Sequence, residues 1–95
     1  MAKFVQIMEL KTSKFDDIDA LDAEWRKATE GKRTLRRDAV CQDRDNPGTY
    51  IIIAEFDSYE EAMQNSNLPE TAEFAEKMAK LVDAPPTFRN LDVIR

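Results

Sequence analysis

The stretch Thr49–Asp57 constrains the fold of this chain more than any other part of the sequence. Its centre, Tyr50–Phe56, is aromatic or aliphatic at every position except Glu55. A strand with one face in water alternates apolar and polar residues, because successive side chains point to opposite faces of the sheet. This stretch does not alternate, which predicts a strand with both faces covered. Helices of so short a chain can cover one face, and we expect a second copy of the chain to cover the other.

Three further segments have the pattern of strands. Lys3–Leu10 places apolar residues on both faces. Thr87–Ile94 does so too, because its apolar residues occur at both odd and even positions. Lys32–Asp45 is the least apolar of the three and is typical of a strand at a sheet edge. The turn Asn46-Pro47-Gly48 joins this segment to Thr49–Asp57, so the two are expected to form a hairpin.

Two helical regions separate these strands. The first carries apolar residues from Phe15 to Ala28 at spacings of three or four, with a capping pattern expected at Ser13 and a stop at Gly31. The second begins at the capping box that starts with Ser58. It is expected to break at Asn65-Ser66-Asn67 and to resume at Pro69. The apolar face of the resumed helix consists of Phe74, Ala75, Met78, Leu81 and Val82.

The resulting order is strand, helix, strand, strand, broken helix, strand. Right-handed crossovers turn this order into an α+β, ferredoxin-like β-α-β-β-α-β fold. Its four-stranded antiparallel sheet has the helices on one face and Thr49–Asp57 and Lys3–Leu10 as the central pair. With 95 residues, the chain is expected to be one domain spanning 1–95.

Composition excludes several classes of function. A net charge of −5 argues against a nucleic-acid partner, since such proteins present a basic patch. No apolar run reaches the roughly 18 residues of a membrane span, and no signal-like segment opens the chain. The single cysteine, Cys41, is expected to be a buried small hydrophobe in a cytoplasmic protein. Without histidine, neither a transition-metal site nor a serine triad is expected.

Two motifs accompany the element order: Glu-Phe-Asp-Ser-Tyr-Glu-Glu-Ala at 55–62, and Asn65-Ser66-Asn67-Leu68-Pro69 leading to Thr71-Ala72-Glu73-Phe74. With them the chain resembles the antibiotic-biosynthesis-monooxygenase-like family of dimeric α/β barrels. The resemblance implies that two sheets pack their open faces into a barrel around a two-fold axis. The family includes cofactor-free oxygenases, haem-degrading enzymes and cyclases, so the resemblance implies the fold more narrowly than the activity.

The chain departs from the catalytic branches of that family at two points. The haem-degrading branch uses a histidine as iron ligand, and this chain has none. A tryptophan typical of the broken helix is also missing there, because Met63 or Leu68 stands in that neighbourhood and the only tryptophan is Trp25 in the first helix. The asparagine common at the break is matched by Asn65 or Asn67.

Glu55 is the candidate base, because burial in an apolar strand would raise the pKa of its carboxyl. The alternative is a carboxylate paired with Arg37 or Arg89. Asn90 shares a parity with Asp92 and is expected to meet Gln6, either as a hydrogen-bonded polar group inside the dimer barrel or as a substrate contact.

The first hypothesis is a homodimer with an apolar pocket between sheet and helices in each protomer. By resemblance it would be a cofactor-independent monooxygenase of an aromatic, polyketide-like small molecule. The proposed roles are Glu55 as base, Asn65 and Tyr50 as donors, Arg37 or Arg89 holding negative charge, and Asn90 in substrate binding. The alternatives are a non-catalytic homodimer that binds a small molecule or is structural, and a cyclase or isomerase that uses the same pocket.

Overall fold

The computed structural model describes residues 2–95 and contains four strands and three helices in that range. None of these helices has the length and apolarity needed to cross a membrane. The elements follow one another as β1 (Phe4–Lys11), α1 (Phe15–Ala28), β2 (Arg37–Gln42), β3 (Thr49–Phe56), α2 (Tyr59–Ser66), α3 (Pro69–Ala79) and β4 (Thr87–Asp92).

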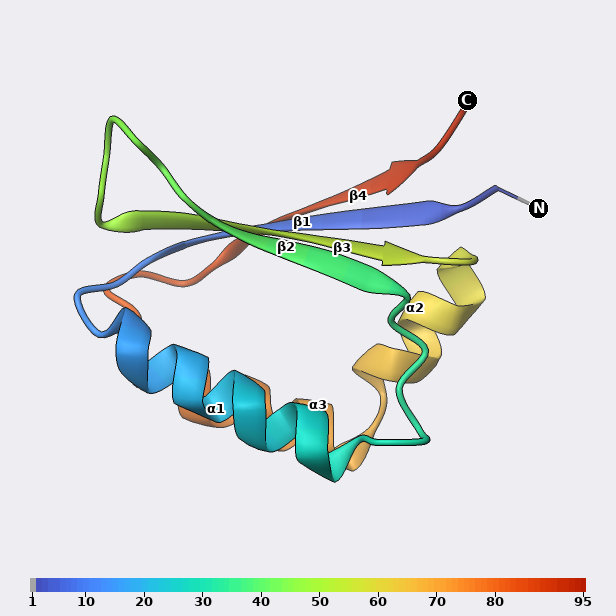
Figure 1. Cartoon of the computed structure of the whole chain (residues 1–95), viewed down its shortest axis with the longest axis horizontal. Helices are drawn as coiled ribbons and strands as arrows, with labels where there is room; N and C mark the ends of the chain where they lie inside the picture. The colour runs from blue at the N-terminus through green and yellow to red at the C-terminus, as the bar shows by residue number, and fades with distance from the viewer. Residues whose placement is uncertain (1) are drawn as a thin grey trace.

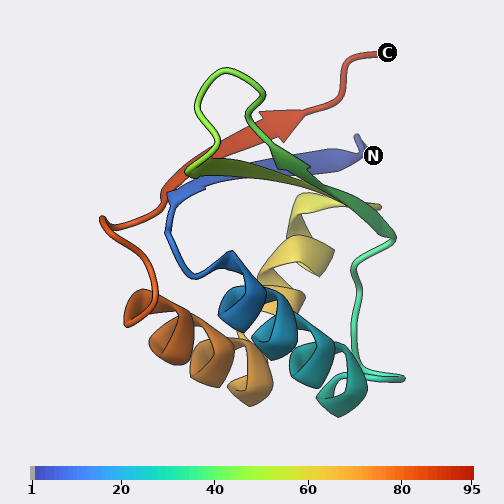
Figure 2. The ribbon, with the colours of Figure 1, turned by 60° about the vertical axis from the view of Figure 1, so that its left-hand side comes forward.

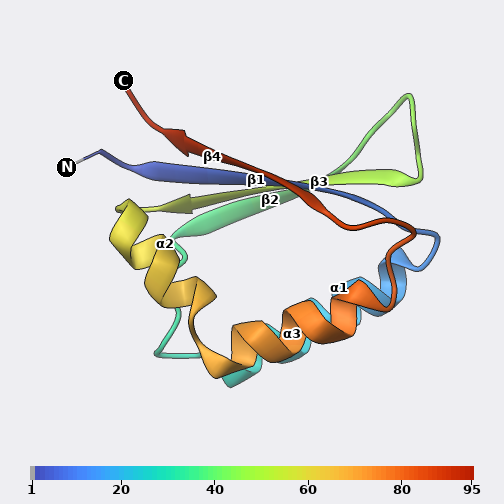
Figure 3. The same cartoon turned by 180° about the vertical axis from the view of Figure 1, so that it is seen from behind.

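The strands form one antiparallel sheet in the order β2-β3-β1-β4, which confirms the predicted ferredoxin-like fold and the central pair β3 and β1. In the β1–β3 register, Phe4 lies opposite Phe56 and Met8 opposite Ile52. All three helices lie on one side of the sheet, with α2 near the end where the two termini emerge (Figure 1). Figure 2 shows α1 and α3 side by side beneath the strands, and Figure 3 shows the same layers from behind.

The strand predicted over Lys32–Asp45 is shorter in the structure. Residues 32–36 form a turn and an extended connection, because the amides of Lys32 and Arg33 both donate to the carbonyl of Thr29 at the end of α1. Gly31 has a φ of 81° in this turn, a conformation that glycine adopts without steric cost. The predicted stop of the first helix at Gly31 therefore corresponds to a left-handed turn just after Ala28.

One predicted helix cap is confirmed and one is wrong. Ser58 caps α2, because its Oγ accepts a hydrogen bond from the amide of Glu61 at 3.2 Å. Ser13 caps nothing, and α1 begins after Lys14 without a side-chain cap. The neighbouring Thr12 is 2% exposed, and its Oγ1 accepts from the Lys14 amide at 2.9 Å and donates to the Leu81 carbonyl at 2.6 Å. Burial selects Thr12 rather than Ser13 for the local hydrogen bonds.

The core beneath the sheet consists of two separate clusters. At one end, Leu10 of β1 packs with Ile18 of α1 and Met78 of α3. At the other end, Phe4 and Phe56 pack with Ala62 of α2. The helices therefore attach to the sheet at both ends, with the break between α2 and α3 in between.

The opposite face of the sheet is apolar at its centre, and no helix among residues 2–95 covers it. Its residues alternate with those that face the helices, and Ile53 and Leu91 each keep 39% of their surface exposed. The apolar members of this open face are Val5, Ile7, Ala39, Cys41, Ile51, Ile53 and Leu91. Cys41 is exposed, so the expectation of a buried cysteine is wrong for the single chain. The reason is that Cys41 lies on the open face, which no helix among residues 2–95 covers.

Replacing Thr12 with valine should lower the free energy of unfolding by about 1–3 kcal/mol, because the Leu81 carbonyl and the Lys14 amide lose a partner in a buried place. Thr87→Val is the matched control, since Thr87 is exposed at the start of β4, and should change stability by less than about 0.5 kcal/mol. Urea unfolding of both variants measures the difference. Equal stability of the two variants would show that the Thr12 hydrogen bonds do not tie β1 to the segment after α3.

Candidate functional site

A cavity of about 530 Å³ lies between the sheet and the helices, where the sequence analysis expects a pocket. Its volume falls within the range of roughly 300–1,000 Å³ typical of small-molecule sites. The sheet contributes one wall and the three helices the other, and most of the lining is apolar. The apolar lining residues are Met8, Trp25, Leu35, Ile52, Ala54, Phe56, Ala72, Phe74, Ala75, Met78 and Phe88.

Trp25 places an indole on the cavity wall from α1. Its Nε1 donates to Thr71 Oγ1 of α3 at 2.9 Å, and its ring lies 6.3 Å from the ring of Phe74. The guanidinium of Arg33 lies over the indole ring, with its central carbon 5.6 Å from the ring centroid. Hydrogen bonding and aromatic contact thus hold the Trp25 indole against α3, although the residue itself belongs to α1.

Three amide side chains converge on the cavity. Gln6 Nε2 donates to Asn90 Oδ1 at 3.1 Å across β1 and β4, so the predicted hydrogen bond is present. The pair faces the helices, because Gln6 shares its parity with the buried Phe4 and Leu10, so the expected place inside the dimer barrel, on the open face, is wrong. Asn65 of α2 is 8% exposed, and its buried Oδ1 has no hydrogen-bond partner among residues 2–95. An orphaned buried oxygen costs stability, and such groups in native proteins often mark a functional site.

A cluster of three charged residues completes the wall. Arg26 Nε donates to Asp22 Oδ2 at 2.8 Å one turn earlier on α1, and Arg26 Nη2 donates to Asp38 Oδ2 on β2 at 2.5 Å. The hydrogen bond that Arg26 donates to Asp22 is the largest of the effects that raise the pKa of Arg26 above its ordinary value. We call Asp22, Arg26 and Asp38 the charged triad. Sequence reasoning missed it, although Asp22 and Arg26 have the i, i+4 spacing of a helix ion pair.

Glu55, the candidate base, lies on the opposite face of the sheet and does not line the cavity. Its carboxylate accepts from Arg37 Nε at 3.0 Å and from Lys3 Nζ at 3.4 Å. The Arg37 hydrogen bond, with a smaller effect from Lys3, holds the pKa of Glu55 below its ordinary value. The expected rise of this pKa is therefore wrong, and the alternative pairing with Arg37 is confirmed.

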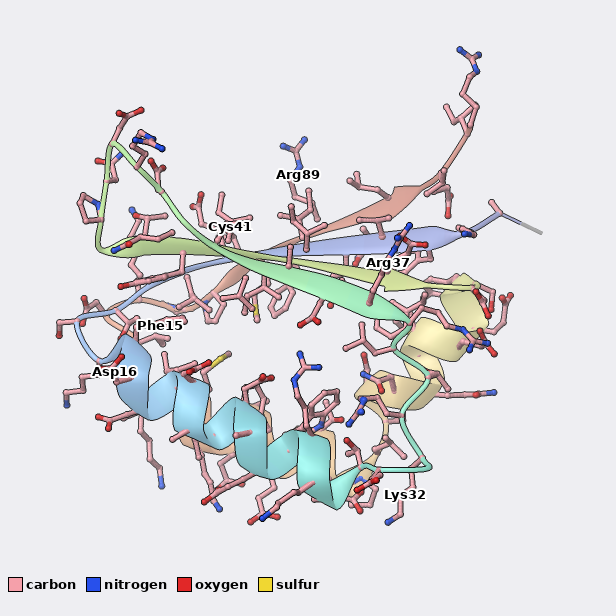
Figure 4. The ribbon with its side chains drawn as sticks, in the orientation of Figure 1. Phe15, Asp16, Lys32, Arg37, Cys41 and Arg89 are labelled. Carbon is pink, nitrogen blue, oxygen red and sulfur yellow. The ribbon has the colours of Figure 1, made fainter. Side chains whose placement is uncertain are left out.

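The two arginines proposed to hold substrate charge also lie outside the cavity. Arg37 and Arg89 point away from α1, on the open face of the sheet (Figure 4). Tyr50 faces the helices but lies beyond the cavity, where its ring stacks on Phe15 at 4.3 Å with an interplanar angle of 9°. Of the six residues predicted for the site, the structure brings only Asn65 and Asn90 to the cavity.

The low pKa of Glu55 depends on Arg37, so Arg37→Gln should move it up toward its ordinary value. The ion pair contributes at neutral pH and is lost as the pH falls through the lowered pKa of the folded state. Carbon-detected NMR titration of the Glu55 carboxyl measures the shift. Arg89→Gln is the matched control on the same face and should leave this pKa in place. A Glu55 pKa that is unchanged in Arg37→Gln would contradict the pairing.

No protein-family model matches the sequence, and no curated protein matches it in sequence. Solved structures do match over nearly the whole chain. A proposed antibiotic biosynthesis monooxygenase from Caulobacter crescentus superposes with a TM-score of 0.86 at 10% identity, covering 99% of this chain and 92% of that one. A second such protein, from Bordetella bronchiseptica, has a TM-score of 0.80 at 13% identity and full coverage of both chains.

SnoaB from Streptomyces nogalater, described as a cofactor-independent oxygenase, superposes with a TM-score of 0.83 at 10% identity. The match covers 100% of this chain and 96% of SnoaB, in the structure of a variant with an asparagine replaced by alanine. Structural matches at such low sequence identity establish the fold of this chain and not its activity. The chain thus has the fold of the antibiotic-biosynthesis-monooxygenase-like proteins, with a cavity of its own composition beneath the sheet.

Proposed function

We propose that this protein is a cofactor-independent monooxygenase that binds an aromatic small molecule in the cavity beneath its sheet. The observation that carries the proposal is the mostly apolar cavity of about 530 Å³, whose lining includes three amides and a tryptophan. A two-ring aromatic molecule fits this volume, and Trp25, Phe74 and Met78 supply flat and polarisable contacts. The shared fold with SnoaB supports the choice of oxygen chemistry.

In this proposal the substrate itself reduces dioxygen after losing a proton. The protein contributes a water-poor cavity, hydrogen bonds that orient the substrate, and a group that accepts the proton. Because Glu55 lies on the other face of the sheet, we assign the role of proton acceptor to Asp22 or Asp38, the two carboxylates that line the cavity. Asn65 and Asn90 are assigned to substrate binding.

Asn65→Ala is expected to weaken ligand binding roughly tenfold without lowering the stability of the fold, because the Asn65 Oδ1 has no partner to lose. Alanine also favours the helix. Asn67→Ala is the matched control, at the exposed end of the same helix. The measurements are equilibrium dialysis with dihydroxynaphthalene, oxygen consumption with dihydroxynaphthalene and anthrone, and urea unfolding.

The outcomes separate the candidate functions. Oxygen uptake that falls in Asn65→Ala and not in Asn67→Ala supports the oxygenase. Binding without oxygen uptake for any aromatic tested would overturn the oxygenase and leave a small-molecule-binding protein. Equal binding by the two variants would remove Asn65 from the site.

We also propose that two copies of the chain pack through their open faces. The support is physical: the face is apolar at its centre, and the ion pairs of Glu55 with Lys3 and Arg37 lie on the same face near one end of β3. Ile53 and Leu91 would leave water in such a dimer, at about 25 cal/mol for each Å² of apolar surface buried.

Ile53→Lys should dissociate this dimer, with a dissociation constant raised roughly a hundredfold, because the substitution buries an unpaired charge. Ala23→Lys on the exposed side of α1 is the matched control and should leave the association unchanged. Sedimentation equilibrium at micromolar concentration measures both. A wild-type protein that sediments as a single chain would overturn the proposed dimer.

A further inference from the structure

Two charged side chains lie on the open face without an ion partner among residues 2–95. Within the strands, the charged residues of this face are Glu9, Lys11, Arg37, Glu55 and Arg89. Arg37 and Glu55 pair with each other, and Lys11 is the exposed last residue of β1. Glu9 and Arg89 are exposed, and no ion pair in the described part of the chain includes either of them. They are therefore the charges that a covering layer has to match.

Glu9 and Arg89 border the apolar centre of the open face. Glu9 lies opposite Ile51 of β3 in the β1–β3 register. Arg89 lies opposite Ile7, which in turn lies opposite Ile53, and the Arg89 side chain points away from the helices (Figure 4). A second sheet laid over the two isoleucines would also remove Glu9 and Arg89 from water. Each charge then needs a partner, because a buried charge without one is costly.

A two-fold axis can match both charges at once. In a symmetric dimer the two copies present the same patch to each other, so a contact between two different residues occurs twice. Arg89 of each copy can therefore meet Glu9 of the other copy. One symmetry operation then pairs all four of these charges and leaves none of them uncompensated.

The register of the sheet brings such an axis to the apolar centre. Adjacent strands lie about 4.8 Å apart, and successive residues on one face of a strand lie about 6.8 Å apart. On this grid, the line across which Glu9 and Arg89 exchange places runs obliquely over the strands and passes close to Ile53. A two-fold axis along that line places Ile53 of one copy against Ile53 of the other. The alignment that pairs the charges is thus also one that buries the apolar centre.

We propose that Glu9 and Arg89 form reciprocal ion pairs across the dimer and so fix how its two open faces are aligned. This inference rests on the dimer under the proposed function, because it assigns the contacts that set the register of that dimer. An apolar face alone would let one sheet slide or rotate over the other. The charges penalise every alignment that leaves them unpaired or brings like charges together. The open face therefore recognises a second copy of this chain by charge as well as by apolar area.

Reversing the charge at either position should weaken the dimer. Glu9→Arg opposes two positive charges at both contacts, and Arg89→Glu opposes two negative ones. Sedimentation equilibrium should give each variant a dissociation constant at least about tenfold above that of the wild type. Lys14→Glu is the matched control, since it changes net charge as Arg89→Glu does, at an exposed position beside α1 in the helical layer, and should dimerise like the wild type.

The outcomes of this measurement separate the inference from the dimer itself. A wild-type dimer that both reversals leave unchanged would overturn the inference and leave the dimer standing. A wild-type protein that sediments as a single chain would overturn the dimer. The double variant Glu9→Arg with Arg89→Glu restores opposite charges and should dimerise like the wild type, which also shows that the fold tolerates both substitutions. A double variant that stays folded and monomeric would count against the pairing.

Mixing the two single variants tests whether the ion pairs cross between copies. In a heterodimer of Glu9→Arg with Arg89→Glu, both contacts again join opposite charges. Native mass spectrometry should therefore show this heterodimer as the main dimeric species, with about the affinity of the wild-type dimer. Pairs formed within one chain would stay broken in the mixture, because each variant carries two like charges at these positions.

A second mixture controls for the general attraction between oppositely altered chains. Glu9→Arg mixed with Lys14→Glu combines the same net charges but leaves two arginines opposed at one contact. It should leave Glu9→Arg largely monomeric. Absence of the heterodimer from the first mixture, or equal amounts of heterodimer in the two mixtures, would overturn the inference.

Discussion

The arrangement beneath the sheet depends on the break between α2 and α3, and the break depends on Pro69. A proline disfavours the helical conformation of the residue before it, and Leu68 has an extended backbone with φ −62° and ψ 136°. The two halves of the broken helix can therefore leave in different directions. One half packs on Phe4 and Phe56, and the other extends the cluster around Leu10. A continuous helix would have one axis and could not reach both clusters in this way, so the cavity between them follows from one backbone constraint.

The fold was predictable because its signals are local. The unbroken apolar run of β3, the turn at Asn46-Pro47-Gly48 and the break before Pro69 each act within a few residues, and right-handed crossovers leave few ways to connect the elements. The local predictions that were wrong concern adjacent residues that can make the same hydrogen bond. Ser13 and Thr12 are both suitable hydroxyls near the start of α1, and only tertiary burial decides between them.

The site was less predictable, because strand parity separates two faces without saying which face the helices cover. Both faces of β1 and β3 are apolar, so the sequence alone allowed Glu55 to be either a buried base or a carboxylate on an open face. The helices cover the face of Phe4, Met8 and Leu10, and this places Glu55 with Arg37 on the other side. The charged triad joins a helix to a strand twelve residues away in sequence, a contact that no periodicity reveals.

The two faces of the sheet carry different kinds of electrostatics, and this difference supports separate roles for them. On the open face, Glu55 forms ion pairs with Lys3 and Arg37, whose side chains are mostly exposed. Exposed charges of this kind are typical of the rim of an interface. On the cavity face, the charges form a closed cluster that holds α1 against β2, and the nearby Asn65 oxygen is left without a partner. A chain selected for stability alone would be expected to place an apolar side chain at position 65, since that removes an uncompensated cost. The amide at position 65 therefore carries a cost that the packing of the fold does not offset, as expected of a residue assigned to ligand binding.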